Sequence, residues 1–199
     1  GGMGAVYRAV DHATGQLVAV KEMHGLEPEA HERFTRECSF LASLDEPGIV
    51  RYVAHGTTEA GSKFLAMEWV DGPTVSDEIK RRGFRVRESV ELVAAVAKIV
   101  AVVHRRGIVH RDIKPSNIVL QAGDHRRPKL LDFGVARLEG NAGGDVTRSG
   151  LVVGSAGYLS PEQATGVRDI DARADVFALG CLLFKCITGI GRASCRERV

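Results

Sequence analysis

Short apolar runs separated by turn residues predict a small antiparallel sheet in the first 70 residues. Residues 11–15 carry a turn signal between the first two runs, so these are expected to pair as a hairpin. Between the second and third runs, the apolar spacing predicts a helix over residues 29–44, with Phe34, Cys38, Leu41 and Leu44 on one face. The strands are expected at residues 5–10, 17–21, 49–55 and 63–70.

After an Asp71-Gly72-Pro73 linker the pattern becomes mainly helical. The segment 86–106 is rich in Ala and Val, and we expect it to be buried on most sides. Glycines and small polar residues over 139–149 predict a mobile loop. Strands followed by helices indicate an α+β protein with two lobes. The helices are expected at 75–82, 86–106 and 171–188, and two short strands at 118–120 and 129–131.

Composition narrows the class of protein. The 199 residues are 44% hydrophobic and 26% charged, which is ordinary for a globular chain and argues against disorder. The formal net charge is +2 and no apolar run reaches the length of a membrane span, so we expect no nucleic-acid partner and no membrane contact from this segment. Four cysteines without a C-x-x-C pair favour a reducing compartment, and no signal peptide is expected.

One stretch carries residue types suited to phosphoryl transfer, H-R-D-I-K-P-S-N at residues 110–117. Asp112 would orient an attacking hydroxyl, Lys114 would offset phosphate charge, and Asn117 would hold a metal ion. Asp132 follows Asn117 by 15 residues and precedes Phe and Gly. Its carboxylate suits magnesium, which prefers oxygen ligands. Each acid alone is equally compatible with an N-cap or a turn, but the ordered combination disfavours that interpretation.

Features nearer the N-terminus are weaker by themselves. Gly1, Gly2 and Gly4 would let a backbone approach phosphate oxygens, although a glycine-rich turn is more often only a turn. Lys21 ends a Val-Ala-Val-Lys run and Glu37 lies on the following helix, and either could be an ordinary solvated charge.

Taken in order, the motifs resemble those of the eukaryotic-like, or Hanks-type, serine/threonine protein kinases of bacteria. The resemblance covers residues 1–189 and implies a two-lobe protein-kinase-like fold, with an antiparallel sheet and one helix in the N-lobe and a mainly helical C-lobe. The motifs are G-G-M-G-A-V-Y, V-A-V-K, R-F-T-R-E, M-E-W-V-D-G, H-R-D-I-K-P-S-N, L-D-F-G-V-A-R, G-S-A-G-Y-L-S-P-E-Q and D-A-R-A-D-V-F-A-L-G.

The resemblance implies a site for ATP with Mg²⁺, or with Mn²⁺ in its place. Gly1 and Gly4 would be the second and third glycines of the phosphate-covering loop. Lys21 would contact the α- and β-phosphates and pair with Glu37. The residues implied around the adenine are Val6, Ala19, Val119, the gatekeeper Met67, and Glu68 and Val70 through their backbones.

For catalysis, the resemblance makes Asp112 the catalytic aspartate and Lys114 its phosphate-binding neighbour. Asn117 and Asp132 would hold the metal ion. A spine linking the lobes, anchored by Asp175, would be formed by Leu41, Tyr52, His110 and Phe133.

Regulation and specificity are implied in the same way. A lysine two positions after Asp112, here Lys114, resembles the pattern of serine/threonine-specific members rather than that of tyrosine kinases. Arg111 implies control by phosphorylation, because a phosphate on the loop 139–160 would give it a charged partner. Candidate phosphorylation sites, equally interpretable as ordinary loop hydroxyls, are Thr147 and Ser149.

Several positions depart from the family pattern. Ser155 replaces the usual Thr, and its hydroxyl would still bond Asp112 and Lys114. Glu162 would pair with an arginine that this chain does not contain, and Glu46 replaces a His without a catalytic role. Lys185 stands where relatives have Glu, a reversal that would change the preference for basic substrates unless it is a base-calling error.

We expect three segments: residues 1–70 as the N-lobe without its first strand and first glycine, residues 71–189 as a partial C-lobe, and residues 190–199 as non-native. The last segment, I-G-R-A-S-C-R-E-R-V, is the translation of ATC GGA AGA GCG TCG TGT AGG GAA AGA GTG, which resembles a sequencing adapter. Setting aside its three arginines and one glutamate leaves 24 basic and 24 acidic residues, so the +2 belongs to this segment.

The expected function is ATP-dependent phosphorylation of Ser and Thr hydroxyls on protein substrates, with self-association for autophosphorylation. The expected location is the cytoplasm, in a full-length protein that a membrane anchor could hold. Two alternatives stay open at this point: a kinase-like scaffold that binds ATP without catalysis, and a fragment that is inactive because the C-lobe is incomplete. Intact Lys21, Asp112, Asn117 and Asp132 argue against the scaffold.

Overall fold

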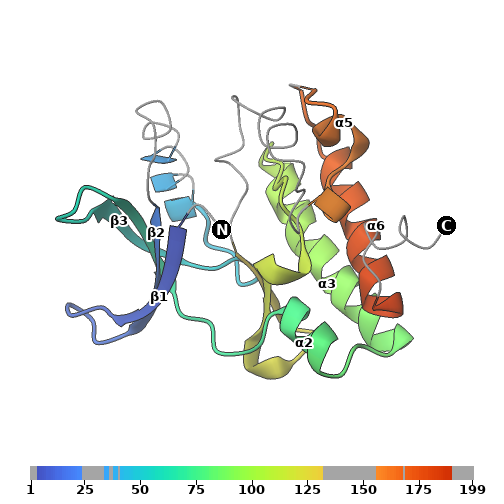
Figure 1. The fold of residues 1–199 in the computed structure, drawn as a ribbon, viewed down its shortest axis with the longest axis horizontal. Helices are drawn as coiled ribbons and strands as arrows, with labels where there is room; N and C mark the ends of the chain where they lie inside the picture. The colour runs from blue at the N-terminus through green and yellow to red at the C-terminus, as the bar shows by residue number, and fades with distance from the viewer. Residues whose placement is uncertain are drawn as a thin grey trace. The chain divides into compact units, whose positions relative to one another are not determined.

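The computed structural model describes residues 4–23, 34–35, 38–39, 41–131, 156–167 and 169–189. The chain divides into two compact units, Gly1–Val70 and Asp71–Val199, and the division falls at the Asp-Gly-Pro segment (Figure 1). We call them the sheet unit and the helical unit and describe each by itself.

The sheet unit is built on four antiparallel strands in the order β1-β2-β4-β3. Asp11 closes the first hairpin, because its carboxylate accepts hydrogen bonds from Ala13 N–H at 3.0 Å and Thr14 Oγ1 at 2.7 Å. Gly15 follows with φ of 71°, and its N–H donates to Asp11 O at 2.7 Å. The predicted hairpin is therefore confirmed. The strands are β1 (Gly4–Val10), β2 (Leu17–Met23), β3 (Tyr52–Thr57) and β4 (Lys63–Glu68).

The third strand begins later than the sequence predicts. Ile49 N–H donates to Glu46 O at 2.9 Å, so this residue still belongs to a turn. Ile49 and Val50 are nevertheless buried, which explains why their apolar side chains resemble the start of a strand. Regular pairing with β4 starts at Tyr52.

The predicted helix over 29–44 falls partly outside the described residues. Its described pieces at 34–35, 38–39 and 41–42 are helical. The apolar face is confirmed, because the four residues that defined it, Phe34, Cys38, Leu41 and Leu44, are all buried.

The helical unit is built around two long helices, α3 (Val86–Arg105) and α6 (Arg173–Thr188), which lie side by side (Figure 1). Both helices were predicted to within two residues. The smaller elements are α2 (Val75–Arg81), α5 (Pro161–Ala164), the paired strands β5 (Ile118–Leu120) and β6 (Pro128–Leu130), and 3₁₀ turns at Pro115–Asn117, Gln121–Gly123 and Ala156–Tyr158.

Burial along α3 corrects one prediction. The helix is buried along a single stripe that recurs every three or four residues, and it is not buried on most sides. Val86 and Val90 are exposed, so a composition rich in Ala and Val did not mean that the helix is buried all round. The buried stripe consists of Ser89, Leu92, Val96, Val100 and Val103. Leu92, Val96 and Val100 pack into a core with side chains of α6 and β5.

Polar side chains fix both ends of α2. Thr74 and Asp77 form a capping box at its start, with Asp77 N–H donating to Thr74 Oγ1 at 3.1 Å. At its end, Arg81 and Arg82 both donate to the carboxylate of Glu78, which is 2% exposed. These hydrogen bonds, first that from Arg81, hold the pKa of Glu78 below its usual value of 4.5.

The linker is tied to the helical unit through its backbone. Leu120 N–H donates to Pro73 O at 2.9 Å, and Ala122 N–H donates to Asp71 O at 2.8 Å. Gly72 lies between these two bonds with φ of 147°. A Cβ atom there would lie 2.0 Å from Leu120 O, so only glycine fits this position.

We predict that Gly72→Ala lowers the free energy of unfolding by about 3 kcal/mol or more, because the new methyl group collides with a backbone oxygen. Gly83→Ala is the matched control: Gly83 also has positive φ, but a Cβ there meets nothing within 4 Å. The control should cost only about 1 kcal/mol. Chemical denaturation followed by circular dichroism measures both, and equal losses would contradict the collision.

We predict that the Glu78 cluster makes stability depend on pH. A lowered pKa means that the carboxylate stabilises the fold above about pH 4.5, and this contribution is lost as pH falls through the lower folded pKa. Glu78→Gln should therefore cost about 2 kcal/mol near pH 7 and much less near pH 3. Denaturation curves at the two pH values test this, with Glu59→Gln, an exposed side chain in the turn between β3 and β4, as the control. A cost that does not change with pH would contradict the prediction.

Candidate active site

The loop between α3 and β5 brings Asp112, Lys114 and Asn117 together, as the sequence predicts. Lys114 Nζ lies 2.7 Å from Asp112 Oδ2. Asn117 Nδ2 donates to the same oxygen at 2.8 Å and to the backbone oxygen of Asp112 at 3.0 Å. The carboxylate is thus held in one orientation by a cation and an amide, both within five residues of it.

Asn117 is fixed from several sides. It ends the 3₁₀ turn Pro115–Asn117, its N–H donates to Lys114 O at 3.0 Å, and its own carbonyl accepts from Leu131 N–H at 2.9 Å. Because Asp112 O can only accept, the side-chain atom facing it must be Nδ2. The amide oxygen Oδ1 therefore points the other way, where Ser116 Oγ lies at 3.5 Å.

Asp175, on the first turn of α6, anchors the base of this loop. Its two carboxylate oxygens accept the backbone N–H groups of His110 and Arg111, each at 2.8 Å. His104, in the last turn of α3, places Nε2 at 2.7 Å from Asp175 Oδ2. Asp175 is fully buried, so its charge is balanced by these three donors rather than by water.

The ring of His110 spans the loop. Its Nδ1 accepts from Asp112 N–H at 3.3 Å, and its Nε2 faces Leu131 O at 3.3 Å. The first contact requires an unprotonated Nδ1 and the second a proton on Nε2, which indicates the neutral ring. His110 is fully buried and links Asp112 to the residue that precedes Asp132.

Arg111 has a strained backbone with φ of 67°, one of two such non-glycine residues in the described chain. Three contacts hold it there. Its N–H donates to Asp175, and its carbonyl accepts a hydrogen bond from Gln163 Nε2 at 2.9 Å. Its guanidinium donates to Ile170 O at 3.3 Å. The strain is therefore offset by groups from α5, from α6 and from the segment between these helices.

In the sheet unit, four of the predicted ATP-binding residues lie on one face. Directly paired residues of antiparallel strands share a face, and so do residues two apart on a strand. Val6 pairs with Lys21, Ala19 pairs with Met67, and Ala19 and Lys21 are two apart on β2. Val6, Ala19, Lys21 and Met67 therefore project from the same side of the sheet.

The remaining predicted nucleotide-binding positions are placed as follows. Gly4 begins β1, and Glu68 ends β4, with its N–H donating to Arg51 O at 2.9 Å. Val70 is half-buried just beyond β4. Val119, in the helical unit, is buried at the centre of β5.

The structure tests only some of the other predicted positions. Leu41 and His110 of the predicted spine are buried and Tyr52 is half-buried. Glu162 is half-buried on α5. The predicted positions outside the described residues are Gly1, Glu37, Asp132, Phe133, Thr147, Ser149 and Ser155, together with segments 139–149 and 190–199.

Sequence reasoning missed His104 and Gln163 as supports of the loop. Both act from positions 50 or more residues away along the chain from the atom they contact. Gln163 does carry a local signal, because Ser160 and Gln163 form the capping box of α5. His104 has none, since a histidine near a helix end is an ordinary surface residue.

Comparison with known proteins identifies the class. Residues 1–194 match the protein kinase domain. The chain therefore belongs to the protein kinase domain family, which confirms the fold class expected from the motifs.

Individual relatives agree with this family. The serine/threonine-protein kinase PknB of Mycobacterium tuberculosis is 38% identical over 196 residues, which are 95% of this chain and 31% of PknB. The serine/threonine-protein kinase pkn2 of Myxococcus xanthus is 37% identical over 95% of this chain and 23% of its own length. The chain is thus similar to bacterial kinases and spans about a third or less of their length.

A solved structure shares the fold. The crystal structure of Rad53 1-466 in complex with AMP-PNP matches with a TM-score of 0.76 and 26% identity, over 96% of this chain and 46% of that one. None of the described helices is long and apolar enough to cross a membrane. The described residues also contain no cluster of three His, Cys, Asp or Glu side chains able to hold a metal ion.

We predict that Asp175→Asn loosens the loop at its base. Asparagine keeps one acceptor, but its amide hydrogens then face a backbone N–H group, so the free energy of unfolding should fall by about 3 kcal/mol. Amide hydrogen exchange at His110 and Arg111 should accelerate together with this loss. Asp171→Asn, which changes an exposed carboxylate two residues before α6, should leave both measurements nearly unchanged. Protected amides in the Asp175 variant would contradict the anchoring role.

Proposed function

We propose that this chain is the catalytic domain of a serine/threonine protein kinase, which transfers the γ-phosphoryl group of ATP to Ser and Thr hydroxyls of protein substrates. The observation that carries the proposal is the Asp112–Lys114–Asn117 network on the loop that Asp175 anchors. Membership of the protein kinase domain family supports it, as do the names of the bacterial relatives.

In this proposal Asp112 orients the substrate hydroxyl toward the γ-phosphorus and receives its proton as the new P–O bond forms. The bond between the γ-phosphorus and the β,γ-bridging oxygen breaks at the same centre, and ADP leaves. Lys114 and Asn117 both hold Asp112 Oδ2, so the carboxylate is preorganised before substrate arrives. Lys114 adds a positive charge next to the transferring group.

The donor chemistry of the loop fits magnesium. Asn117 spends both of its amide hydrogens on Asp112, which leaves its oxygen as the atom that would bind a hard cation. We assign Asp132 as the second protein ligand, one residue beyond Leu131, whose N–H is bonded to Asn117 O. When bound, Mg²⁺, or Mn²⁺ in its place, neutralises charge on the phosphate oxygens.

We assign nucleotide binding to the residues that the sequence motifs imply. Lys21 contacts the α- and β-phosphates and is paired by Glu37, and Gly1 and Gly4 cover the phosphates. The apolar side chains Val6, Ala19, Met67 and Val119 contact the adenine, and Glu68 and Val70 bind its edge through their backbones. The shared sheet face of Val6, Ala19, Lys21 and Met67 supports this assignment. The AMP-PNP complex of Rad53 supports it as well, since AMP-PNP is an analogue of ATP.

Regulation is proposed to act through Arg111, whose backbone is already tied to Asp175 and Gln163. A phosphate on Thr147 or Ser149 would supply an anionic partner for its guanidinium, and self-association of two kinase domains would allow autophosphorylation. Ser155 and Glu162 would support the substrate-binding segment. We propose that the domain works in the cytoplasm, where ATP and protein substrates are available.

We predict that Asp112→Asn in the full-length protein lowers phosphoryl transfer by roughly 100-fold to 10,000-fold, because the amide cannot accept the substrate proton. Transfer of radiolabel from [γ-³²P]ATP to a protein substrate measures the loss, and nucleotide binding should persist. Asp124→Asn, on the turn between β5 and β6, is the matched control. Labelling by Asp112→Asn at the level of the control would contradict the catalytic role of Asp112, and nucleotide binding without labelling by any form would favour the ATP-binding scaffold.

A further inference from the structure

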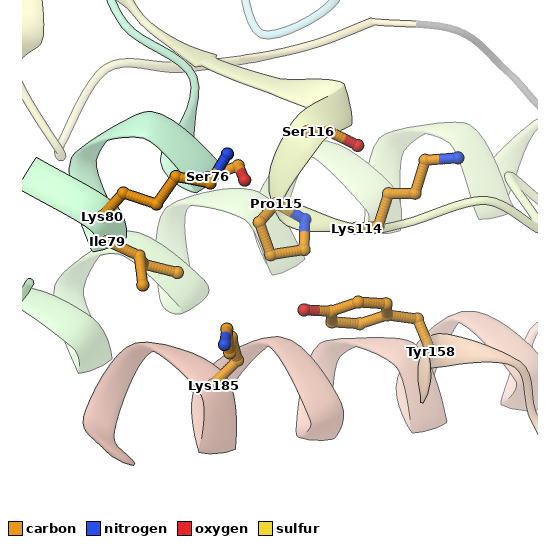
Figure 2. A pocket seen from close by; sticks show the side chains of 8 residues that line it. All are labelled: Ser76, Ile79, Lys80, Lys114, Pro115, Ser116, Tyr158 and Lys185. Carbon is orange, nitrogen blue, oxygen red and sulfur yellow. The ribbon is translucent and has the colours of Figure 1, made fainter. Parts of the chain in front are cut away.

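A pocket of about 370 Å³ opens beside the loop that carries Asp112. It lies within the helical unit, between α2, the 3₁₀ turn at Pro115–Asn117, and α6 (Figure 2). The lining residues are Ser76, Ile79, Lys80, Lys114, Pro115, Ser116, Tyr158 and Lys185. Lys114 connects this pocket to the catalytic carboxylate, since its Nζ is 2.7 Å from Asp112 Oδ2.

The lining is strongly cationic. It includes three lysines and, among the described residues, no acidic side chain. Lys80 and Lys185 form no ion pair within the described part of the chain, whereas Lys114 is paired with Asp112. The carboxylates that interact with these lysines are Asp112, which is paired with Lys114, and Asp77, which lies three residues before Lys80 on α2. Two lysines at one pocket repel each other unless an anion lies between them.

Lys185 is held in place for such an anion. It projects from α6 toward the pocket (Figure 2), and its Nζ donates to the carbonyl oxygen of Gly189 at 2.7 Å. An ammonium group has three donors, and a neutral carbonyl does not cancel its charge. In Figure 2, Lys80 extends from α2, while Lys114 extends away from both Lys80 and Lys185.

Neutral donors complete the lining. Tyr158 directs its hydroxyl into the space beside Pro115, and Ser76 and Ser116 lie across from it (Figure 2). Burial, reinforced by Cys186 and Cys181, raises the pKa of Tyr158 to about 12, so the hydroxyl keeps its proton at neutral pH. The pocket thus offers ammonium and hydroxyl hydrogens, which are the groups that bind carboxylate and phosphate oxygens.

We infer that this pocket binds an anionic side chain of the protein substrate, a carboxylate or a phosphate, close to the Ser or Thr that is phosphorylated. This inference rests on the proposed kinase function, because Lys114, which lines the pocket, is paired with Asp112. Lys80 and Lys185 determine the specificity, and Tyr158 orients the bound group. The chain should therefore prefer acidic or already phosphorylated segments and reject basic ones.

Peptide kinetics with the full-length protein test the inference. Each peptide carries one serine, and one flanking position at a time is Asp, Glu, phosphoserine, Asn or Lys. For at least one position, we expect Asp, Glu or phosphoserine to raise kcat/KM over Asn by roughly fivefold, and Lys to lower it. A larger gain for phosphoserine than for Asp would identify a phosphate site, and the reverse a carboxylate site. No preference for any anion over Asn would overturn the inference.

Charge reversal provides the decisive comparison. Lys185→Glu should lower the ratio of kcat/KM for the anionic peptide to that for its Asn twin by roughly tenfold. Lys80→Glu, on the exposed side of α2, should lower it in the same direction and serves if the first variant fails to fold. Lys98→Glu, the same change on an exposed position of α3 outside the pocket, should leave the ratio at the wild-type value. Equal ratios in all three variants would overturn the inference.

A binding measurement separates this inference from the proposed function. Fluorescence anisotropy with labelled anionic and Asn peptides gives Kd values without ATP. If anionic peptides bind more tightly and Lys185→Glu removes the difference, the pocket assignment is supported even where no phosphate is transferred. In that case only the proposed kinase function fails. If phosphate is transferred with no selectivity in kinetics or binding, the kinase function stands and the pocket assignment fails.

Discussion

The buried carboxylate of Asp175 organises the centre of the helical unit. A fully buried charge must be compensated, and here the backbone N–H groups of His110 and Arg111 and the imidazole of His104 compensate it. His104 is on α3 and Asp175 is on α6, so their contact joins the two long helices. The same carboxylate also fixes the loop that follows α3. Helix packing and the geometry around Asp112 therefore cannot vary independently.

The cluster around Asp112 was predictable because its members are close in sequence. Asp112, Lys114 and Asn117 lie within one loop, so their residue types and spacing carry most of the information about their contacts. The residues that support this loop were harder to predict from the sequence. His104 contacts a residue 71 positions away, and nothing in the local pattern distinguishes it from a surface histidine. Lys80 on α2 and Lys185 on α6 likewise line one pocket only because of the tertiary structure.

The sheet shows the same division between local and tertiary information. Alternation along β2 suffices to place Ala19 and Lys21 on one face. Adding Val6 and Met67 to that face requires the register of two hairpins, and a shift of one residue would turn both side chains to the other side. The late start of β3 shows the limit of apolar patterns, since Ile49 and Val50 are buried without yet being part of the ladder.

The left-handed backbone of Arg111 has a consequence for which residues the loop can accept. Glycine would adopt this φ at no steric cost, and asparagine or aspartate at little, whereas arginine costs about 1–2 kcal/mol. A loop selected for backbone shape alone would thus drift toward glycine at this position. Because arginine stands here in spite of that cost, we infer that the guanidinium limits which residues position 111 tolerates. Glycine at this position would meet the backbone requirement, a positive φ, and would remove the positively charged side chain.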